Sequence, residues 1–415
     1  MNDYRRVFII GAGASADAGM ALGDVLLHEV IKTAESEQTT EKEFLQIIKN
    51  VKNRLAIIFP NLLKEDKYPN FEEYLNIVYD FSKGKNIGGA YLKNDLSALS
   101  DGVDKDTMIL LYWYLYTACH RWAGRMSMEY IPDFVSAEVY LDKDAVISLN
   151  YDWLFERFLI KSLNHQVNPD TMRISCGTNV CDIASGNIDS IYGDASLYPF
   201  YKPHGSANWL IGEKGQMLIN KGTGVINFVG DSKLKTLKDN ENSKIIVYFS
   251  NDYLDYKELI SNKLITAIIP PIGLKGYLGP SMICKLLGVK DTKNSEQYSI
   301  FEDLISDQVN GAVKSIHSLY EDGEIWLVGT KLYIDPYLYN QVILKKINNP
   351  KTKIVFIGPD EKTAEKFAED FGEIFHYNDT LKNYSIQLKI KNANKSGRWN
   401  GLDLNKDFKL LKKGG

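Results

Sequence analysis

The sequence has few cysteines, and their spacing does not predict a zinc site. Its 415 residues include four cysteines. The nearest two, Cys176 and Cys181, have no second pair with which to complete four ligands around a zinc ion. Scattered cysteines are typical of reduced thiols in the cytosol. We therefore expect a cytoplasmic protein that holds no metal.

Long apolar runs and an excess of one charge are also missing. The run Val7–Ile10 is too short for a signal peptide, and no run approaches the ~18 apolar residues of a membrane-spanning helix. Lys and Arg total 49 against 53 Asp and Glu, a formal net charge of −4. The sequence therefore predicts no membrane association and no direct nucleic-acid site.

Short apolar segments that alternate with helical patterns define the fold class. Five such segments end near a glycine, proline or asparagine, which is typical of buried strands. An amphipathic helix is expected over Phe301–Tyr320, with others over about 15–34 and 361–371. This alternation predicts an α/β, Rossmann-like, doubly wound parallel sheet. The expected strands are Arg5–Ile10, Ala145–Leu149, Ala267–Ile269, Ile325–Val328 and Ile354–Ile357.

The predicted domain covers residues 1–380. It contains a helical module over about 35–140, where apolar residues such as Phe44, Ile47, Ile48 and Val51 recur at helical spacing. Residues 165–260 mix turn-forming residues with short β-prone runs, which indicates an irregular insertion. A further strand is possible over Ile374–Tyr377, and residues 381–415 are expected to form a polar tail.

A glycine-rich segment directly follows the first predicted strand. Gly11 and Gly13 would allow close backbone approach to a phosphate, and Ser15 could bond one or cap the helix. The dinucleotide pattern G-x-G-x-x-G is incomplete, because Ala16 occupies the third glycine position. No acidic residue ends a second strand about 20 residues later. A dehydrogenase is therefore disfavoured, and a tight turn without a ligand stays an alternative.

Two further segments carry residue types that perform chemistry. Asn150 and Asp152 follow the second predicted strand, and His204 precedes Gly205 about fifty residues later. Helix capping would also explain Asn150 and Asp152. A histidine fixed in a turn would also explain His204.

Taken in order, these segments resemble the sirtuin superfamily. The matching residues are Gly11-Ala12-Gly13-Ala14-Ser15 with Gly19, then Asn150-Tyr151-Asp152, then His204-Gly205-Ser206. A fourth segment, Gly329-Thr330-Lys331-Leu332-Tyr333-Ile334-Asp335-Pro336, resembles the sirtuin G-T-S-L-x-V-x-P segment that contacts NAD. Each match alone is modest, but four in the family's order are specific.

The chain also departs from the sirtuin deacylases. It lacks the two C-x-x-C pairs of their zinc ribbon, and Lys331 replaces a serine. The loop pattern S-G-I-P-D-F-R is replaced by Ala18-Gly19-Met20-Ala21-Leu22-Gly23-Asp24, without the proline and arginine. A sirtuin-like chain without a zinc ribbon is similar to bacterial antiphage NADases.

The resemblance implies NAD as the substrate and a role for each matching residue. His204 would be the general base toward water or a ribose hydroxyl, and Asn150 would hold a ribose hydroxyl or the attacking water. Asp152 would contact the nicotinamide carboxamide or stabilise developing positive charge nearby. The other matching residues would bind the pyrophosphate or the adenosine half of NAD: Gly11, Ala12, Gly13, Ser15, Gly19, Gly329 and Thr330.

Several alternatives stay open at this point. The chain could be a non-catalytic sensor of NAD or ADP-ribose, or a deacylase or ADP-ribosyltransferase of sirtuin type. The hydrolytic product could be ADP-ribose or a cyclised form. Because unrestrained NAD loss would kill the host, we also expect a homo-oligomer or a protein partner, such as a helicase-like ATPase or an Argonaute, to control activity.

Overall fold

The computed structural model describes two compact units of the chain. Unit 1 comprises residues 1–20, 119–203 and 305–415, and unit 2 comprises residues 21–118 and 204–304. The described residues are 4–16, 20–36, 41–82, 105–125, 144–154, 174–175, 180–181, 198–213, 218–220, 224–226, 234–238, 245–250, 256–261, 264–268, 300–330, 335–357, 374–377 and 408–411.

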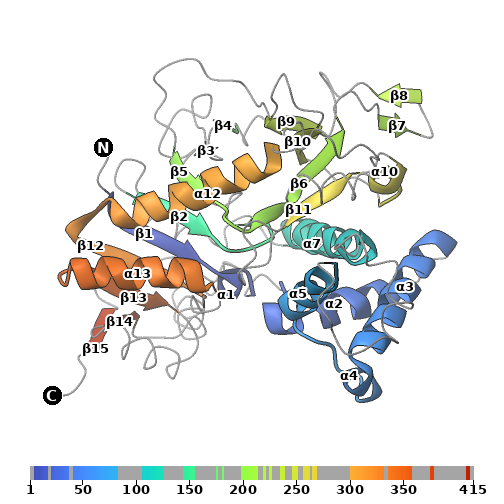
Figure 1. Cartoon of the computed structure of the whole chain (residues 1–415), viewed down its shortest axis with the longest axis horizontal. Coiled ribbons are helices and arrows are strands. Elements are labelled where there is room, and N and C mark those ends of the chain that lie inside the picture. Colours follow the sequence, from blue (N-terminus) through green and yellow to red (C-terminus); the bar gives the residue numbers. More distant parts are fainter. Residues whose placement is uncertain are drawn as a thin grey trace. The chain divides into compact units, whose positions relative to one another are not determined.

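Unit 1 is built on one sheet in the order β15-β14-β13-β12-β1-β2-β5-β3-β4 (Figure 1). Every neighbouring pair from β14 to β3 is parallel, and the two edge strands β15 and β4 are antiparallel to their neighbours. The strands are β1 (Tyr4–Ile10), β2 (Asp144–Ser148), β3 (Ile174–Ser175), β4 (Val180–Cys181), β5 (Tyr198–Tyr201), β12 (Leu319–Val328), β13 (Lys353–Ile357), β14 (Ile374–Tyr377) and β15 (Phe408–Leu411).

The strand order reverses at β1. From β1 the chain adds β2 and β5 on one side of the sheet, and later adds β12, β13 and β14 on the other. The predicted α/β, Rossmann-like parallel sheet is therefore confirmed. In open sheets of this kind, ligands bind outside the carboxyl ends of the strands at the point of reversal. Here that point lies between β1 and β12.

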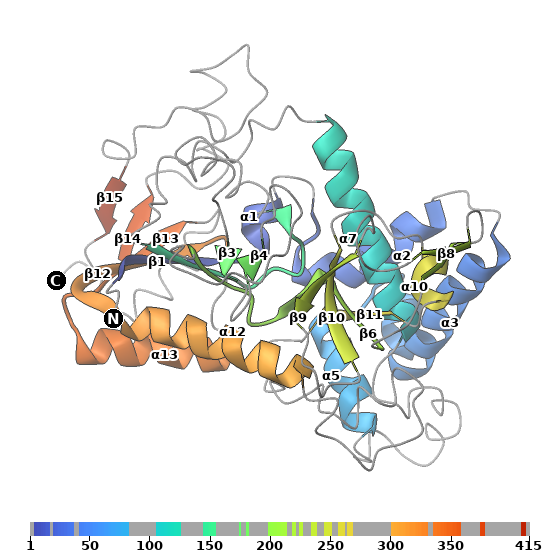
Figure 2. The ribbon, with the colours of Figure 1, turned by 90° about the horizontal axis from the view of Figure 1, so that it is seen from above.

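Two helices cover one face of this sheet. Helices α12 (Ile300–His317) and α13 (Pro336–Asn348) lie side by side along it (Figure 2). Alternate residues of the central strands point at these helices, as the period of two in a strand requires. The shared core consists of Val7, Ile9, Ala145, Ile147, Ala312, Ile316, Leu319, Ile325, Leu327, Leu338, Val342, Ile354 and Phe356.

A buried ion pair joins the first part of β1 to the start of β2. The guanidinium of Arg6 donates from Nε to Oδ1 of Asp144 at 3.0 Å and from Nη2 to Oδ2 at 2.8 Å. The same guanidinium lies over the rings of Phe8 and Trp326, which contact each other. The pair therefore fixes the register in which Arg6 lies opposite Asp144.

Unit 2 contains a group of helices and a four-stranded antiparallel sheet in the order β11-β6-β10-β9. The predicted spacing is found on α3, where Phe44, Ile47, Ile48 and Val51 are buried. The elements are α2 (Gly23–Ser36), α3 (Lys42–Ile58), α4 (Pro60–Lys64), α5 (Phe71–Ser82), α7 (Lys105–Arg125, whose last turns belong to unit 1), β6 (Gly205–Glu213), β7 (Leu218–Asn220), β8 (Gly224–Ile226), β9 (Leu234–Lys238), β10 (Ile245–Ser250), α10 (Tyr256–Ser261) and β11 (Ile265–Ile268).

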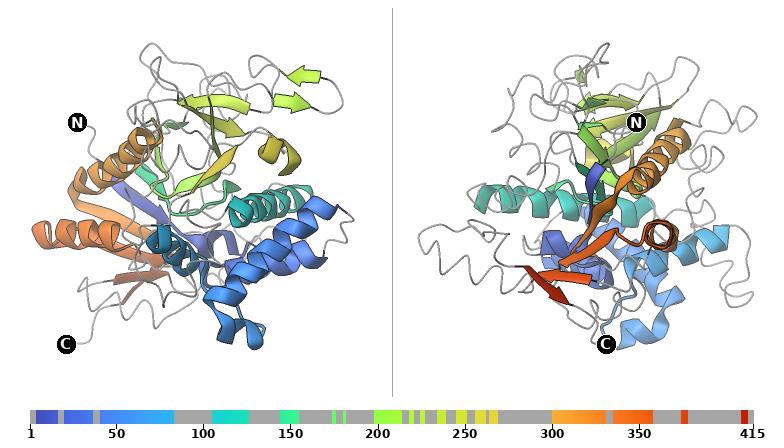
Figure 3. Two further views of the ribbon diagram at one scale, coloured as in Figure 1. Left: turned by 45° about the vertical axis from the view of Figure 1, so that its right-hand side comes forward. Right: turned by 90° about the vertical axis from the view of Figure 1, so that its left-hand side faces the viewer.

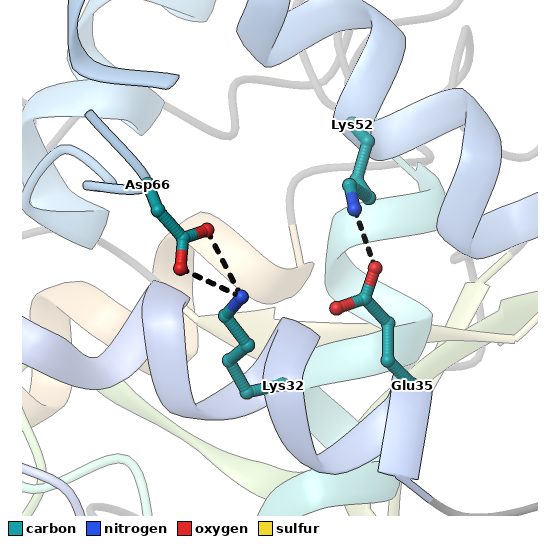
Figure 4. A network of polar contacts seen from close by, with 4 residues as sticks. All are labelled: Lys32, Glu35, Lys52 and Asp66. Carbon is teal, nitrogen blue, oxygen red and sulfur yellow. Dashed lines mark hydrogen bonds and ion pairs between the residues drawn. The ribbon is translucent and has the colours of Figure 1, made fainter. Parts of the chain in front are cut away.

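Exposed ion pairs cross the surface of the helical part of unit 2. Lys32 on α2 donates to both carboxylate oxygens of Asp66, and Lys52 on α3 pairs with Glu35 on α2 (Figure 4). Each partner keeps a third or more of its side chain in solvent. Such pairs add little to stability, because water already solvates both charges.

Three segments differ from the sequence prediction. Ala267, expected in a strand of the parallel sheet, lies on β11 in the antiparallel sheet of unit 2. The helix expected over about 15–34 is two helices, α1 (Ala12–Ala16) and α2, separated by the non-helical residues Met20–Leu22. Only α2 carries the apolar spacing that packs a helix, with Leu26 and Leu27 among its buried residues. The expected polar tail contributes β15, which lies beside β14 at the edge of the sheet (Figure 3).

Other expectations lie outside the described residues. One of them is the helix expected over about 361–371. No described helix is long and apolar enough to cross a membrane.

Replacement of Asp144 by asparagine tests the buried ion pair. Asp144→Asn removes the negative charge that faces the buried guanidinium of Arg6, so the free energy of unfolding should fall by about 3–5 kcal/mol. Denaturant unfolding at neutral pH measures this change. Lys32→Ala, which removes an exposed pair, is the matched control and should leave the midpoint unchanged. Equal effects of the two substitutions would show that the Arg6–Asp144 pair has no special role.

Candidate functional site

The loops that follow β1 and β12 touch each other at the carboxyl edge of the sheet. The N–H of Gly11 donates to the carbonyl of Val328 at 2.9 Å, and the N–H of Gly13 donates to the carbonyl of Gly329 at 2.8 Å. These two bonds continue the β1–β12 ladder beyond the ends of the strands. They hold the segment Gly11–Ser15 against the first residues after β12.

Three glycines make this contact possible. A Cβ at Gly11 would lie 2.5 Å from Cβ of Thr330, and a Cβ at Gly13 would lie 2.7 Å from the carbonyl oxygen of Gly329. Gly329 has a φ of +58°, and a Cβ there would lie 2.3 Å from the nitrogen of Ala14. The packing of one loop on the other therefore requires all three glycines. The N–H groups of Gly11 and Gly13 already have partners, so a phosphate at this loop would need other donors.

Asn150 lies at the carboxyl end of the neighbouring strand β2. The N–H of Leu149 donates to the carbonyl of Ile10 at 2.8 Å, which extends the β1–β2 pairing to this point. The next residue turns its side chain toward the glycine loop, and Nδ2 of Asn150 donates to Oγ of Ser15 at 3.0 Å. The structure thus brings Ser15 and Asn150 together, although 135 residues separate them.

The amide oxygen of Asn150 is buried without a partner. The side chain is almost fully enclosed, with 4% of the residue exposed. Among the described residues, none donates a hydrogen bond to its Oδ1. Because buried polar atoms are nearly always paired, such an atom at a strand end indicates a position where a ligand or a water donates a hydrogen bond.

Asp152 is buried beside the same serine. One of its carboxylate oxygens accepts a hydrogen bond from the N–H of Leu154 at 2.9 Å, and the Ser15 hydroxyl also bonds to the carboxylate. Burial raises the pKa of Asp152 above its ordinary value, while the nearby charge of Lys202 and these two hydrogen bonds oppose the rise.

Two residues that the sequence did not identify support this cluster. Lys202, 1% exposed, donates from Nζ to the carbonyl of Asp152 at 2.6 Å. The backbone N–H of Lys202 in turn donates to Oε1 of Gln308 on α12 at 2.8 Å. Gln308 is a polar residue between buried Ile305 and Val309, which was a usable signal in the sequence. Its own Nε2 meets no acceptor among the described residues.

The other predicted site residues are distributed as follows. Thr330 is buried directly after β12, and Asp335 caps α13 by accepting from the N–H of Leu338. His204 is buried and belongs to unit 2, where it precedes β6. Ala12 begins α1, and Gly19 lies outside the described residues.

The positive φ of Gly205 (+70°) explains the glycine after His204. A Cβ there would lie 1.9 Å from the carbonyl oxygen of Ala267 on β11. The turn that carries His204 is therefore shaped by the pairing of β6 with β11.

The wider comparisons add no further identification. No protein-family model matches the chain, and no curated protein matches it. Within the described residues, no cluster of three histidine, cysteine or acidic side chains could hold a metal ion.

A comparison of two glycines tests the contact between the loops. Gly13→Ala should lower the free energy of unfolding by about 1–3 kcal/mol, because its Cβ would overlap the backbone of Gly329. Gly23→Ala is the matched control, since its Cβ would have no neighbour nearer than Glu72 Oε1 at 3.8 Å. It should be neutral or slightly stabilising. Chemical denaturation of both variants checks this, and equal stabilities would contradict the contact.

The raised pKa of Asp152 predicts a specific dependence of stability on pH. Between its ordinary pKa and the raised value, the folded chain retains a proton that the unfolded chain has lost, so stability falls as pH rises through this window. Asp152→Asn should remove this contribution to the fall of stability with pH. It can also change stability by an amount that does not depend on pH. Unfolding midpoints measured across the acidic pH range compare the two proteins. If the midpoints of the wild type and of Asp152→Asn change with pH in the same way, Asp152 does not have a raised pKa in the folded chain.

Proposed function

We propose that the chain is a sirtuin-like NAD⁺ glycohydrolase that cleaves NAD⁺ to nicotinamide and ADP-ribose. The observation that carries the proposal is the unpartnered amide oxygen of Asn150, held by Ser15 at the carboxyl ends of β1 and β2. An enclosed acceptor of this kind suits a hydroxyl-bearing ligand. Its position beside the reversal of strand order agrees with where doubly wound sheets bind nucleotides.

The resemblance of the four sequence segments supplies the identity of the substrate. Asn150 holds a ribose hydroxyl or the attacking water, and Gly11, Ala12, Gly13, Ser15 and Gly19 form the pyrophosphate side of the site. Because Gly11 and Gly13 have used their N–H groups, other donors carry that contact. Gly329 and Thr330 line the adenosine side.

The reaction needs little acid catalysis. The bond between C1′ and the nicotinamide nitrogen breaks with its electron pair moving to the ring, whose positive charge is thereby neutralised. Water forms the new bond to C1′, and His204 accepts its proton. The ribose passes through an oxocarbenium-like state, as in other glycosyl transfers. Acceptor oxygens placed near the ribose suit this developing positive charge.

The resemblance to zinc-free sirtuin-like proteins supports a role in bacterial antiphage defence, where infection triggers depletion of NAD. Control by assembly into a homo-oligomer, or by an activating protein partner, belongs to this proposal. An ATPase of helicase type or an Argonaute is the kind of partner expected.

Release of nicotinamide from NAD⁺ tests the proposal. Purified full-length chain should produce nicotinamide and ADP-ribose, alone or after activation by its partner. Asn150→Ala and His204→Ala should each lower the rate about 100-fold or more, since one loses the positioned acceptor and the other the base. Lys32→Ala, which alters an exposed residue of unit 2, is the control with unchanged rate.

The outcome distinguishes the alternatives. Stoichiometric NAD⁺ binding without nicotinamide release would identify a sensor. Nicotinamide release only with an acylated or acceptor protein present would identify a deacylase or ADP-ribosyltransferase. Full activity in both site variants would exclude the proposed catalytic residues.

A further inference from the structure

The hydroxyl of Ser15 connects two side chains from another strand end. It accepts a hydrogen bond from Nδ2 of Asn150 at 3.0 Å and bonds to the carboxylate of Asp152. All three residues are more than nine-tenths buried. The hydroxyl therefore has two partners within the protein and little access to water.

When Asp152 is ionised, chemistry fixes the direction of these hydrogen bonds. An ionised carboxylate can only accept, and a serine hydroxyl has a single hydrogen. The hydrogen of Ser15 must therefore point to Asp152, which leaves a lone pair of Oγ for an incoming donor. The amide of Asn150 can supply a donor only through Nδ2. Its Oδ1 then points away from Ser15, and this is the atom that has no partner among the described residues.

We propose that Asp152 and Ser15 are positioning residues that set the amide orientation of Asn150, so that the site presents a hydrogen-bond acceptor to a hydroxyl of its ligand. This assignment differs from the contact with nicotinamide that the family resemblance implies for Asp152. The carboxylate of Asp152 is occupied within the protein, by the N–H of Leu154 and by Ser15. It acts on the ligand only through the serine and the asparagine.

The acceptor has a chemical consequence for the ligand. A hydroxyl or water that donates its hydrogen to Oδ1 keeps a lone pair for the reacting carbon. If Asn150 instead presented its NH₂ group, this group would donate to the lone pair of the ligand's hydroxyl or water. That ligand oxygen would then be a poorer nucleophile or stabilising group. Given the proposed NAD⁺ hydrolysis, on which this step depends, the ligand group is a ribose hydroxyl or the attacking water.

Asp152→Asn should reverse the chain of hydrogen bonds. The oxygen of the new amide remains the acceptor for the N–H of Leu154, so its NH₂ group faces Ser15. Ser15 then accepts on that side and turns its hydrogen toward Asn150. The amide of Asn150 must rotate to offer Oδ1 to Ser15, and Nδ2 faces the ligand. A substitution of similar size thus converts the acceptor of the site into a donor.

The side-chain amide signal of Asn150 in a ¹⁵N-asparagine NMR spectrum of the full chain tests the connection. Its loss in Asn150→Ala identifies it. In the wild type the signal should shift with pH as Asp152 takes up a proton. Among the described residues, the charged group that acts on Asp152 is Lys202. Ser15→Ala should abolish the shift, and Ser15→Thr, which keeps a hydroxyl, should restore it.

Two results would overturn the inference. One is a wild-type signal that does not respond to pH, and the other is an unchanged response in Ser15→Ala. If Ser15→Ala does not fold, Asp152→Asn provides the second test. In that variant the Asn150 signal should lose its pH response and exchange its protons faster with water, and retention of both wild-type properties would contradict the reversal.

A kinetic measurement separates this inference from the proposed function. If the chain hydrolyses NAD⁺, Asp152→Asn should lower kcat about tenfold or more with KM changed less than about twofold, because the effect falls on the reacting group. Ser15→Thr should keep most of the wild-type kcat. Absence of hydrolysis in the wild type would contradict the proposed function and leave the NMR result standing. An active enzyme whose Asn150 signal ignores Asp152 would contradict only the positioning role.

Discussion

The contact between the loops after β1 and β12 is the constraint on which the candidate site depends. Because no side chain fits at Gly11, Gly13 or Gly329, the two loops pack backbone to backbone. This contact fixes where Ser15 lies at the carboxyl edge of the sheet. From there its hydroxyl reaches Asn150, which follows the next strand. The glycines thus act on the site mainly by placing a serine.

Much of the sheet could be predicted from the sequence, since its central strands are continuous apolar runs that are buried on both faces. Val7–Ile10, Ala145–Ile147 and Ile325–Val328 are of this kind. The two N-terminal helices were less predictable, because Ala12–Ala16 is held by contacts with a loop more than 300 residues away. The strand Phe408–Leu411 was missed because its lysine-flanked sequence has the character of a tail and it is paired on one side only.

Site residues were predictable where a local sequence pattern marks them. They were not predictable where their role depends on partners far away in the sequence. Asn150 and Asp152 stand out because they directly follow a buried strand. Lys202 and Gln308 do not, because the role of each depends on partners 50 to 106 residues away. The bond from Ser15 to Asn150 has the same origin, since parallel pairing of β1 and β2 brings their carboxyl ends together. Spacing along the chain contains no information on such contacts.

The parallel pairing of β1 with β12 also affects how the protein is made. Val7 lies opposite Ile325, so the central strand is synthesised more than 300 residues before one of its two neighbours. At ~5–20 residues per second on the ribosome, β1 waits roughly 15–60 s for this partner. During that time the edge of β1 is open to pairing with other chains. Protection of this edge during synthesis, for example by a chaperone, would limit such pairing.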